Sequence, residues 1–147
     1  MVLWRISRHL DLSGAGGLRA PGRWHHTGHP IVYLAGSPAA ALLEVCVHTS
    51  ANDVPPAFTL LKISAPDTAT VARIDLGLLP DDWMIRQELT RDLGTEWLNR
   101  KNSPALEVPS AIVPETFNTL LNPLHREAAE FAIVSSLSYP FDPRIKV

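Results

Sequence analysis

The order of strand-like and helical stretches is the feature that most constrains the fold of this chain. Short runs rich in β-branched, aromatic and aliphatic residues recur along it, and such runs are typical of β-strands. They lie at residues 2–6, 30–35, 57–64, 70–76, 105–114 and 130–145, the last ending in a proline-punctuated tail. Two stretches, 37–50 and 84–101, have the pattern that predicts helices. This mixture favours an α+β fold over a regular βαβ succession, and a length of 147 residues suits one domain spanning 1–147.

The clearest helix start lies at Ser37 and Pro38. Serine is a preferred N-cap, and proline is tolerated at the first helical position because its missing N–H needs no partner there. Leu43 and Val47 are four residues apart, so we expect them to face the core. A neighbouring line on the same helix contains Ala40, Glu44 and His48.

Four local features give further predictions. The strands at 57–64 and 70–76 are joined by the short segment "APDTA", which predicts a hairpin. Gly94 lies inside the second helical stretch, as a tolerated glycine or as a break. Pro109 interrupts a strand, which implies a sheet edge or a bulge. The stretch around Asn122 is rich in turn residues.

Composition excludes several classes of function. The chain has 13 basic and 15 acidic residues, a net charge of −2, so we expect neither direct nucleic-acid binding nor a polybasic membrane patch. Cys46 is the one cysteine, so no internal disulfide forms. No window approaches the roughly 18 apolar residues of a membrane span. The expected location is the cytoplasm.

Common catalytic and metal signatures are missing. The glycine-rich stretch "DLSGAGGLRAPG" lacks the G-x-G-x-x-G spacing of a dinucleotide loop, and no helix pattern follows it. Ser110 is not in a G-x-S-x-G elbow. The histidines at 25, 26 and 29, and Glu44 with His48, match no closed zinc signature, so no metal site is expected.

Arg23, Tyr33, Glu44 and Ser110 form the remaining candidate site. Arginine binds phosphate or carboxylate through two parallel hydrogen bonds, and the glycines around Arg23 would let a ligand approach the backbone. Tyrosine offers a flat face to a planar ring. Each of these residues also has an ordinary structural explanation, so their spacing leaves both readings open.

Several separated motifs resemble the RES domain family, in the same order along nearly the whole chain. They are "LWRI", "GRWHHTG", "IVYLA", "AALLEVCVH", "LGTEWL", "LEVPSAIVP" and "LLNPLH". The arginine, glutamate and serine for which the family is named fall on Arg23, Glu44 and Ser110. The family's tyrosine falls on Tyr33, and its N-terminal arginine on Arg5.

The resemblance implies an ADP-ribosyltransferase-like fold, in which mixed and antiparallel strands form a central cleft with a few flanking helices. It also implies a bacterial toxin of a type II toxin–antitoxin pair that depletes NAD+ by cleaving the nicotinamide–ribose bond, by hydrolysis or phosphorolysis. NAD+ is then the substrate, inorganic phosphate is the alternative co-substrate, and no separate cofactor is expected. The expected partner is an Xre-type helix-turn-helix antitoxin that blocks the cleft in a hetero-oligomer.

The resemblance also suggests a role for each site residue. Glu44 would stabilise the positive charge that develops on the ribose. Arg23, with Arg5 as a second clamp, would hold the phosphates or the ribose, and Tyr33 would stack on the nicotinamide ring. Ser110 would bind the ribose or the carboxamide through a hydrogen bond. For the histidines, including His48 and His125, we expect no role beyond packing and polarity.

Two alternatives stay open at this point. One is transfer of ADP-ribose to a host protein, for which arginine-specific transferases use a Glu-x-Glu pair. Cys46 occupies the second position of that pair here, which disfavours an arginine acceptor. The other is a catalytically silent module that only binds NAD or an antitoxin, which the full set of polar site residues disfavours.

Overall fold

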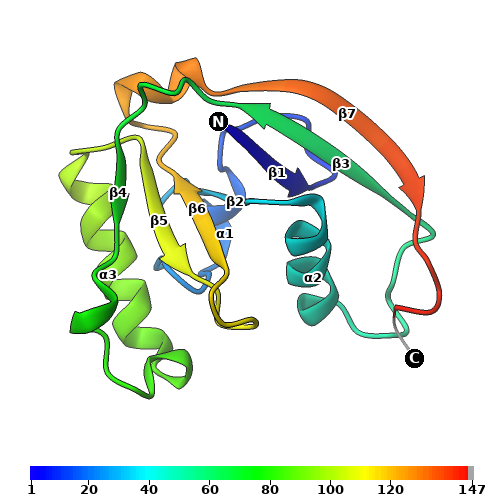
Figure 1. The fold of residues 1–147 in the computed structure, drawn as a ribbon, viewed down its shortest axis with the longest axis horizontal. Helices are drawn as coiled ribbons and strands as arrows, with labels where there is room; N and C mark the ends of the chain where they lie inside the picture. The colour runs from blue at the N-terminus through cyan, green and yellow to red at the C-terminus, as the bar shows by residue number, and fades with distance from the viewer. Residues whose placement is uncertain (146–147) are drawn as a thin grey trace.

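A single mixed sheet with helices on its faces forms the protein (Figure 1). The structure is a computed structural model, and it describes residues 1–145. The strands are β1 (Val2–Ile6), β2 (Val32–Ala35), β3 (Ala57–Ser64), β4 (Val71–Arg73), β5 (Ala105–Pro109), β6 (Phe117–Leu121) and β7 (Ala132–Pro140). The helices are α1 (Gly16–Arg19), α2 (Pro38–His48) and α3 (Gln87–Arg100), with short 3-10 turns η1 (Leu76–Leu78), η2 (Trp83–Ile85) and η3 (Arg126–Glu130). The predicted α+β fold class is confirmed.

The sheet divides at the contact between β1 and β2. The strand order is β4-β5-β6-β2-β1-β3-β7, and every pair is antiparallel except β4 with β5. The β1–β2 pairing consists of Trp4 opposite Ala35, whereas β3 and β7 pair along almost their whole lengths. A left half (β4, β5, β6 and β2) and a right half (β1, β3 and β7) therefore diverge from this point, as Figure 1 shows.

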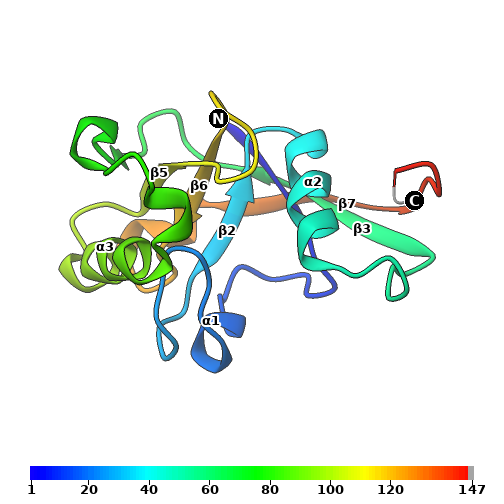
Figure 2. The same cartoon turned by 90° about the horizontal axis from the view of Figure 1, so that it is seen from below.

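Helix α2 packs against β1 and β2, where the two halves part (Figures 1 and 2). The predicted cap is confirmed, because the Ser37 hydroxyl accepts a hydrogen bond from the Ala40 N–H at 3.1 Å. The predicted core face is wrong: Leu43 is 37% and Val47 52% exposed. Ala41 and Cys46 are buried instead, because the helix turns its small residues toward the sheet.

Helix α3 covers the left half of the sheet and continues unbroken through Gly94. The reason for the glycine is a close approach by the loop before β2. A Cβ at position 94 would lie 1.7 Å from the Trp24 carbonyl oxygen, so only glycine lets this loop pass so near the helix.

The predicted hairpin between 57–64 and 70–76 is wrong. β3 lies in the right half between β1 and β7, and β4 is the edge of the left half. A turn in which the Ala69 N–H bonds the Pro66 carbonyl redirects the chain between them. Both edges of β3 are already occupied by β1 and β7, so β4 pairs with the free edge of β5.

Three other local predictions agree with the structure in part. β5 is an inner strand and has no bulge at Pro109, but β4 pairs only with 105–107, so Pro109 has one free side and the missing N–H leaves no strand without a partner, as an edge position predicts. The turn at Asn122 is present, but strand β6 directly before it was not expected. The glycine-rich segment also contains the short helix α1.

Two hydrophobic clusters lie on opposite faces of the sheet. Alternation along the strands divides the residues between them: Leu121 joins one cluster, whereas Leu120 joins the other, beneath α3. In β2, Val32 and Leu34 belong to the first cluster, and Tyr33 packs against the second. Within residues 1–145, no helix has the length and hydropathy to cross a bilayer.

Candidate active site

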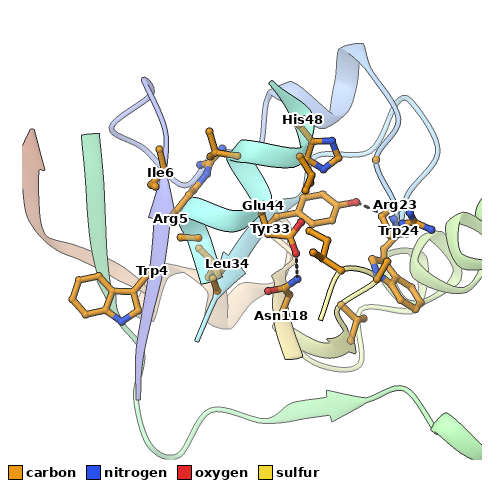
Figure 3. A pocket seen from close by; sticks show the side chains of 18 of the residues that line it. Trp4, Arg5, Ile6, Arg23, Trp24, Tyr33, Leu34, Glu44, His48 and Asn118 are labelled. Atoms are coloured by element: carbon orange, nitrogen blue, oxygen red, sulfur yellow. Dashed lines mark hydrogen bonds between the residues drawn. The ribbon is translucent and has the colours of Figure 1, made fainter. Parts of the chain in front are cut away.

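A cavity of about 730 Å³ opens where the two halves of the sheet separate (Figure 3). Its walls come from β1, the loop before β2, helix α2 and the segment after β5. Arg5, Arg23, Tyr33 and Glu44, which are distant in sequence, all line it. The structure therefore brings together four of the five residues that the sequence singled out.

Glu44 is held by an asparagine that the sequence analysis did not identify. Asn118, on β6, donates from Nδ2 to Glu44 Oε1 at 2.8 Å, and both side chains line the cavity (Figure 3). An amide turned the other way would set its oxygen against a carboxylate oxygen, so repulsion fixes this orientation. The bond ties α2 to the left half of the sheet.

Arg5 brings a partly dehydrated cation from the right half. Its Nη1 donates to the Asp11 carbonyl at 3.3 Å. Burial lowers the pKa of the Arg5 guanidinium below its ordinary value, and the Asp11 carboxylate partly offsets this. Within residues 1–145, no salt bridge neutralises Arg5 or Arg23. Two unpaired cations therefore favour an anionic ligand in the cavity.

Arg23 lies on a loop that α3 holds firmly. The Thr90 hydroxyl donates to the Arg23 carbonyl at 2.6 Å, and Arg91 Nε donates to the Gly22 carbonyl at 2.8 Å. The Arg23 side chain donates from Nη1 to the Met84 carbonyl at 2.5 Å, which leaves most of its donors for a ligand. These bonds fix the loop before any ligand arrives.

Tyr33 and His25 form a second anchor for the same loop. His25 Nε2 lies 3.0 Å from the Ala20 carbonyl, which only accepts, so Nε2 carries the hydrogen. Nδ1 is then an acceptor, and the Tyr33 hydroxyl donates to it at 2.7 Å while accepting the Trp24 N–H at 3.1 Å. A Cβ at Gly22 would lie 2.4 Å from the Tyr33 hydroxyl, so this anchor requires glycine there.

Burial shifts both groups of this anchor toward their neutral forms. It lowers the pKa of His25, which is 3% exposed, and raises the pKa of the Tyr33 phenol well above its ordinary value. The hydrogen of the Tyr33 hydroxyl is used by His25, so Tyr33 offers its ring face rather than a donor to the cavity.

Ser110 does not line the cavity. Its Oγ accepts hydrogen bonds from the Ile112 and Val113 N–H groups at 3.1 and 3.3 Å, and its side chain is buried. Ala111 and Ile112, in the turn that Ser110 holds, do line the cavity. Its contact with the site is therefore through the loop.

The other histidines have different surroundings. His48 lines the cavity one turn after Glu44, and His125 caps η3 by accepting the Glu127 N–H. Across residues 1–145, the one group of potential metal ligands is His26 with Glu88 and Asp92. His26 already bonds Asp92 at 2.6 Å and does not line the cavity.

Two residues of the site were missed by sequence reasoning. His25 was expected to have no role beyond packing, yet it orients Tyr33. Asn118 lies on β6, a strand that was not expected, so its direction could not be inferred. The available signal was a single amide in the apolar stretch "FNTLL".

The chemistry of the cavity follows from its parts. Arg5 and Arg23 attract an anion, the Tyr33 ring offers a stacking surface for a planar group, and the Glu44 carboxylate stabilises positive charge between them.

Comparison with known proteins identifies the family of this chain. The model of the RES domain matches residues 2–142. Toxin Res of Pseudomonas putida is 49% identical over 130 residues, covering 87% of this chain and 88% of that protein. Toxin Res of Photorhabdus laumondii is 36% identical and covers 99% and 97%; the Prs ADP-ribosylating toxin of Sphingobium is 35% identical and covers 97% and 94%.

A solved structure supports the fold. A chain of the M. tuberculosis MbcT–MbcA toxin–antitoxin complex superposes with a TM-score of 0.76 at 19% identity, covering 99% of this chain and 86% of that one. The match of the family model over nearly the whole length, with relatives well above 30% identity, shows that this chain belongs to the RES domain family.

Proposed function

We propose that this protein is the toxin of a toxin–antitoxin pair and that it cleaves the nicotinamide–ribose bond of NAD+. One observation carries the proposal: Arg5, Arg23, Tyr33 and Glu44 converge on a single cavity whose volume suits a nucleotide ligand. The names of the relatives, Toxin Res, support it.

The two arginines hold the substrate from both sides of the division in the sheet. Arg5 from the right half and Arg23 from the loop before β2 bind the diphosphate, whose charge matches two cations without salt bridges. Tyr33 stacks its ring face on the nicotinamide. The anchored loop means that little has to be ordered when NAD+ binds.

Glu44 acts on the bond that breaks. As the C–N bond between ribose and nicotinamide lengthens, its electron pair leaves with nicotinamide, which departs neutral. The ribose carbon becomes oxocarbenium-like, and the Glu44 carboxylate stabilises that charge. Water then adds and gives ADP-ribose and a proton, or phosphate adds and gives phosphorylated ADP-ribose.

Ser110 supports the reaction from behind the wall of the cavity. Its hydroxyl accepts two backbone N–H groups of its own loop. We assign it to holding Ala111 and Ile112 against the substrate, in place of the direct ribose or carboxamide bond that the family resemblance suggests.

The partner we propose is an Xre-type helix-turn-helix antitoxin that closes the cavity. The similar solved chain comes from a complex of a toxin with its antitoxin, which supports a protein partner. Balanced charge on this chain leaves DNA binding to that partner.

Transfer of ADP-ribose to a protein is the second candidate. It is favoured by the 35% identity with the Prs ADP-ribosylating toxin. Cys46, at the second position of the Glu-x-Glu pair, is buried and does not line the cavity, so the pair lacks its second carboxylate and an arginine acceptor is disfavoured.

The test is incubation of the antitoxin-free protein with NAD+, with and without phosphate, followed by chromatography. We expect free nicotinamide, with ADP-ribose or its phosphorylated form. Intact NAD+ would refute the enzymatic proposal. Label from NAD+ on host proteins would identify the transferase instead.

A further inference from the structure

Two asparagines at opposite ends of strand β6 differ in how well they are bonded. Asn122 follows β6 and is buried, and both ends of its amide are used. Its Nδ2 donates to the Leu98 carbonyl at 3.1 Å, and its Oδ1 accepts the Leu124 N–H at 3.1 Å. This is the pattern of a residue that stabilises the fold.

Asn118 is bonded at one end. Its Nδ2 donates to Glu44, but its Oδ1 is buried and has no hydrogen-bond partner within residues 1–145. A buried acceptor without a partner lowers stability, because it lost its hydrogen bonds to water on folding. An apolar side chain of similar shape would not carry this cost.

A residue that costs stability and contacts the reactive carboxylate points to a role in the reaction. Glutamate has three side-chain torsions, so its carboxylate needs a partner to stay in one position. The bond from Asn118 occupies Oε1 and leaves Oε2 to face the ribose. The same bond joins helix α2 to strand β6, and both of its residues line the cavity.

We propose that Asn118 is a positioning residue that orients the Glu44 carboxylate toward the breaking bond. This inference rests on the proposed cleavage of NAD+ and adds a residue to it. Asn118 acts through Glu44, so its loss lowers the rate of the chemical step more than the affinity for substrate.

The kinetic test compares Asn118→Leu and Asn118→Ala with the control Asn122→Ala. For both Asn118 variants we expect kcat for nicotinamide release to fall about 10- to 100-fold, with KM changed less than about threefold. Their melting temperature should be equal to that of the wild type or higher. For Asn122→Ala we expect a lower melting temperature and an unchanged kcat per folded molecule.

The opposite outcomes would overturn the proposal. They are an unchanged kcat in both Asn118 variants, or a loss of stability as large as that of Asn122→Ala. The comparison does not depend on one substitution, because Leu fills the space of Asn and Ala removes it.

A second measurement needs no activity and separates this inference from the proposed function. The side-chain amide signals of Asn118, assigned by their disappearance in Asn118→Ala, are followed by ¹⁵N NMR in Glu44→Ala and in the control Glu130→Ala. Glu130 is an exposed glutamate on η3 that does not line the cavity. We expect them to move in the first and to stay in the second. Signals that do not move in Glu44→Ala would disprove the hydrogen bond between Asn118 and Glu44. An inactive wild type would instead disprove NAD+ cleavage.

Discussion

The two walls of the cavity are built in different ways. The loop wall (residues 21–24) is held by α3 and β2 through hydrogen bonds of Thr90, Arg91 and the Tyr33 hydroxyl, which is itself bonded to His25. The helix wall, α2, packs the small residues Ala41 and Cys46 on the sheet and exposes Leu43 and Val47. Asn118 ties its glutamate to the sheet.

The difference separates binding from chemistry. The loop wall carries Arg23 on a backbone that is fixed by its neighbours, so its shape depends on packing across much of the left half. The helix wall carries Glu44 on a side chain that is bonded to Asn118. Substitutions in the loop wall should therefore change both stability and activity, whereas substitution of Glu44 in the helix wall should change activity and leave stability unchanged.

Glu44→Gln is expected to give the largest effect. It keeps the size of the side chain and removes the charge that we propose stabilises the oxocarbenium-like ribose. We expect nicotinamide release to fall by about 10²- to 10³-fold. The free energy of unfolding, from urea titration, should stay within about 0.5 kcal/mol of the wild type. Full activity in this variant would mean that the helix wall carries no chemistry.

Gly94→Ala tests whether the loop wall depends on its close contact with helix α3. Its Cβ would meet the Trp24 carbonyl at 1.7 Å, so the loop and α3 must separate. We expect a loss of about 3 kcal/mol in the free energy of unfolding and weaker NAD+ binding. Gly16→Ala is the matched control: its Cβ would meet nothing within 4 Å, and we expect stability to be unchanged or slightly raised. Equal stability of the two variants would contradict the close fit.

Acid should weaken the loop wall through His25. Burial first, and then the positive charges of His29 and Arg91, lower the pKa of His25 below its ordinary 6.5, while hydrogen bonds to the Ala20 and Gly17 backbone oppose the shift. Below pH 6.5 the unfolded chain binds a proton that the folded chain does not, so the free energy of unfolding falls as the pH drops.

The measurement is urea unfolding at several pH values between 8 and 5. His25→Gln lacks the titrating group and should show a smaller decrease than the wild type over this range. Identical pH dependence in the two proteins would show that His25 is not held neutral. Helix-wall variants such as Glu44→Gln should keep the His25 part of the decrease.

Leu43→Gln should have the smallest effect. Leu43 is on the outer face of α2, is 37% exposed and does not line the cavity. We expect a change within about 0.5 kcal/mol in stability and unchanged nicotinamide release by the free protein. A large loss of stability would instead support the prediction, made from the four-residue spacing of Leu43 and Val47, that these residues face the core.

The sequence predicted local features better than long-range pairing. Ser37 and Pro38 marked the start of α2 correctly because capping depends on neighbouring residues. The hairpin between 57–64 and 70–76 failed because strand pairing depends on which edges are free, and β1 and β7 had taken those of β3. The core face of α2 failed because small residues, Ala41 and Cys46, allow the closest approach to the sheet.

For the candidate site, too, the sequence predicted the individual residues better than the long-range contacts between them. Chemistry and family resemblance selected Arg5, Arg23, Tyr33 and Glu44, and the fold brings them to one cavity. The contacts that orient them were not readable, because Asn118 is 74 positions from Glu44 and its strand was not expected. From the sequence, His25 was expected to be an ordinary polar loop residue. In the structure its ring is bonded to both Ala20 and Tyr33.

The single Trp4–Ala35 pairing between β1 and β2 has a mechanical consequence. This strand pair has the fewest paired residues in the sheet, and the cavity lies beside it, with Arg5 on one side and Arg23 on the other. A ligand bound by both guanidinium groups therefore connects the two halves of the sheet at the place where their strands are least paired. Because such a ligand binds the folded protein and not the unfolded chain, at a concentration 100 times Kd it adds about 2.7 kcal/mol to the free energy of unfolding.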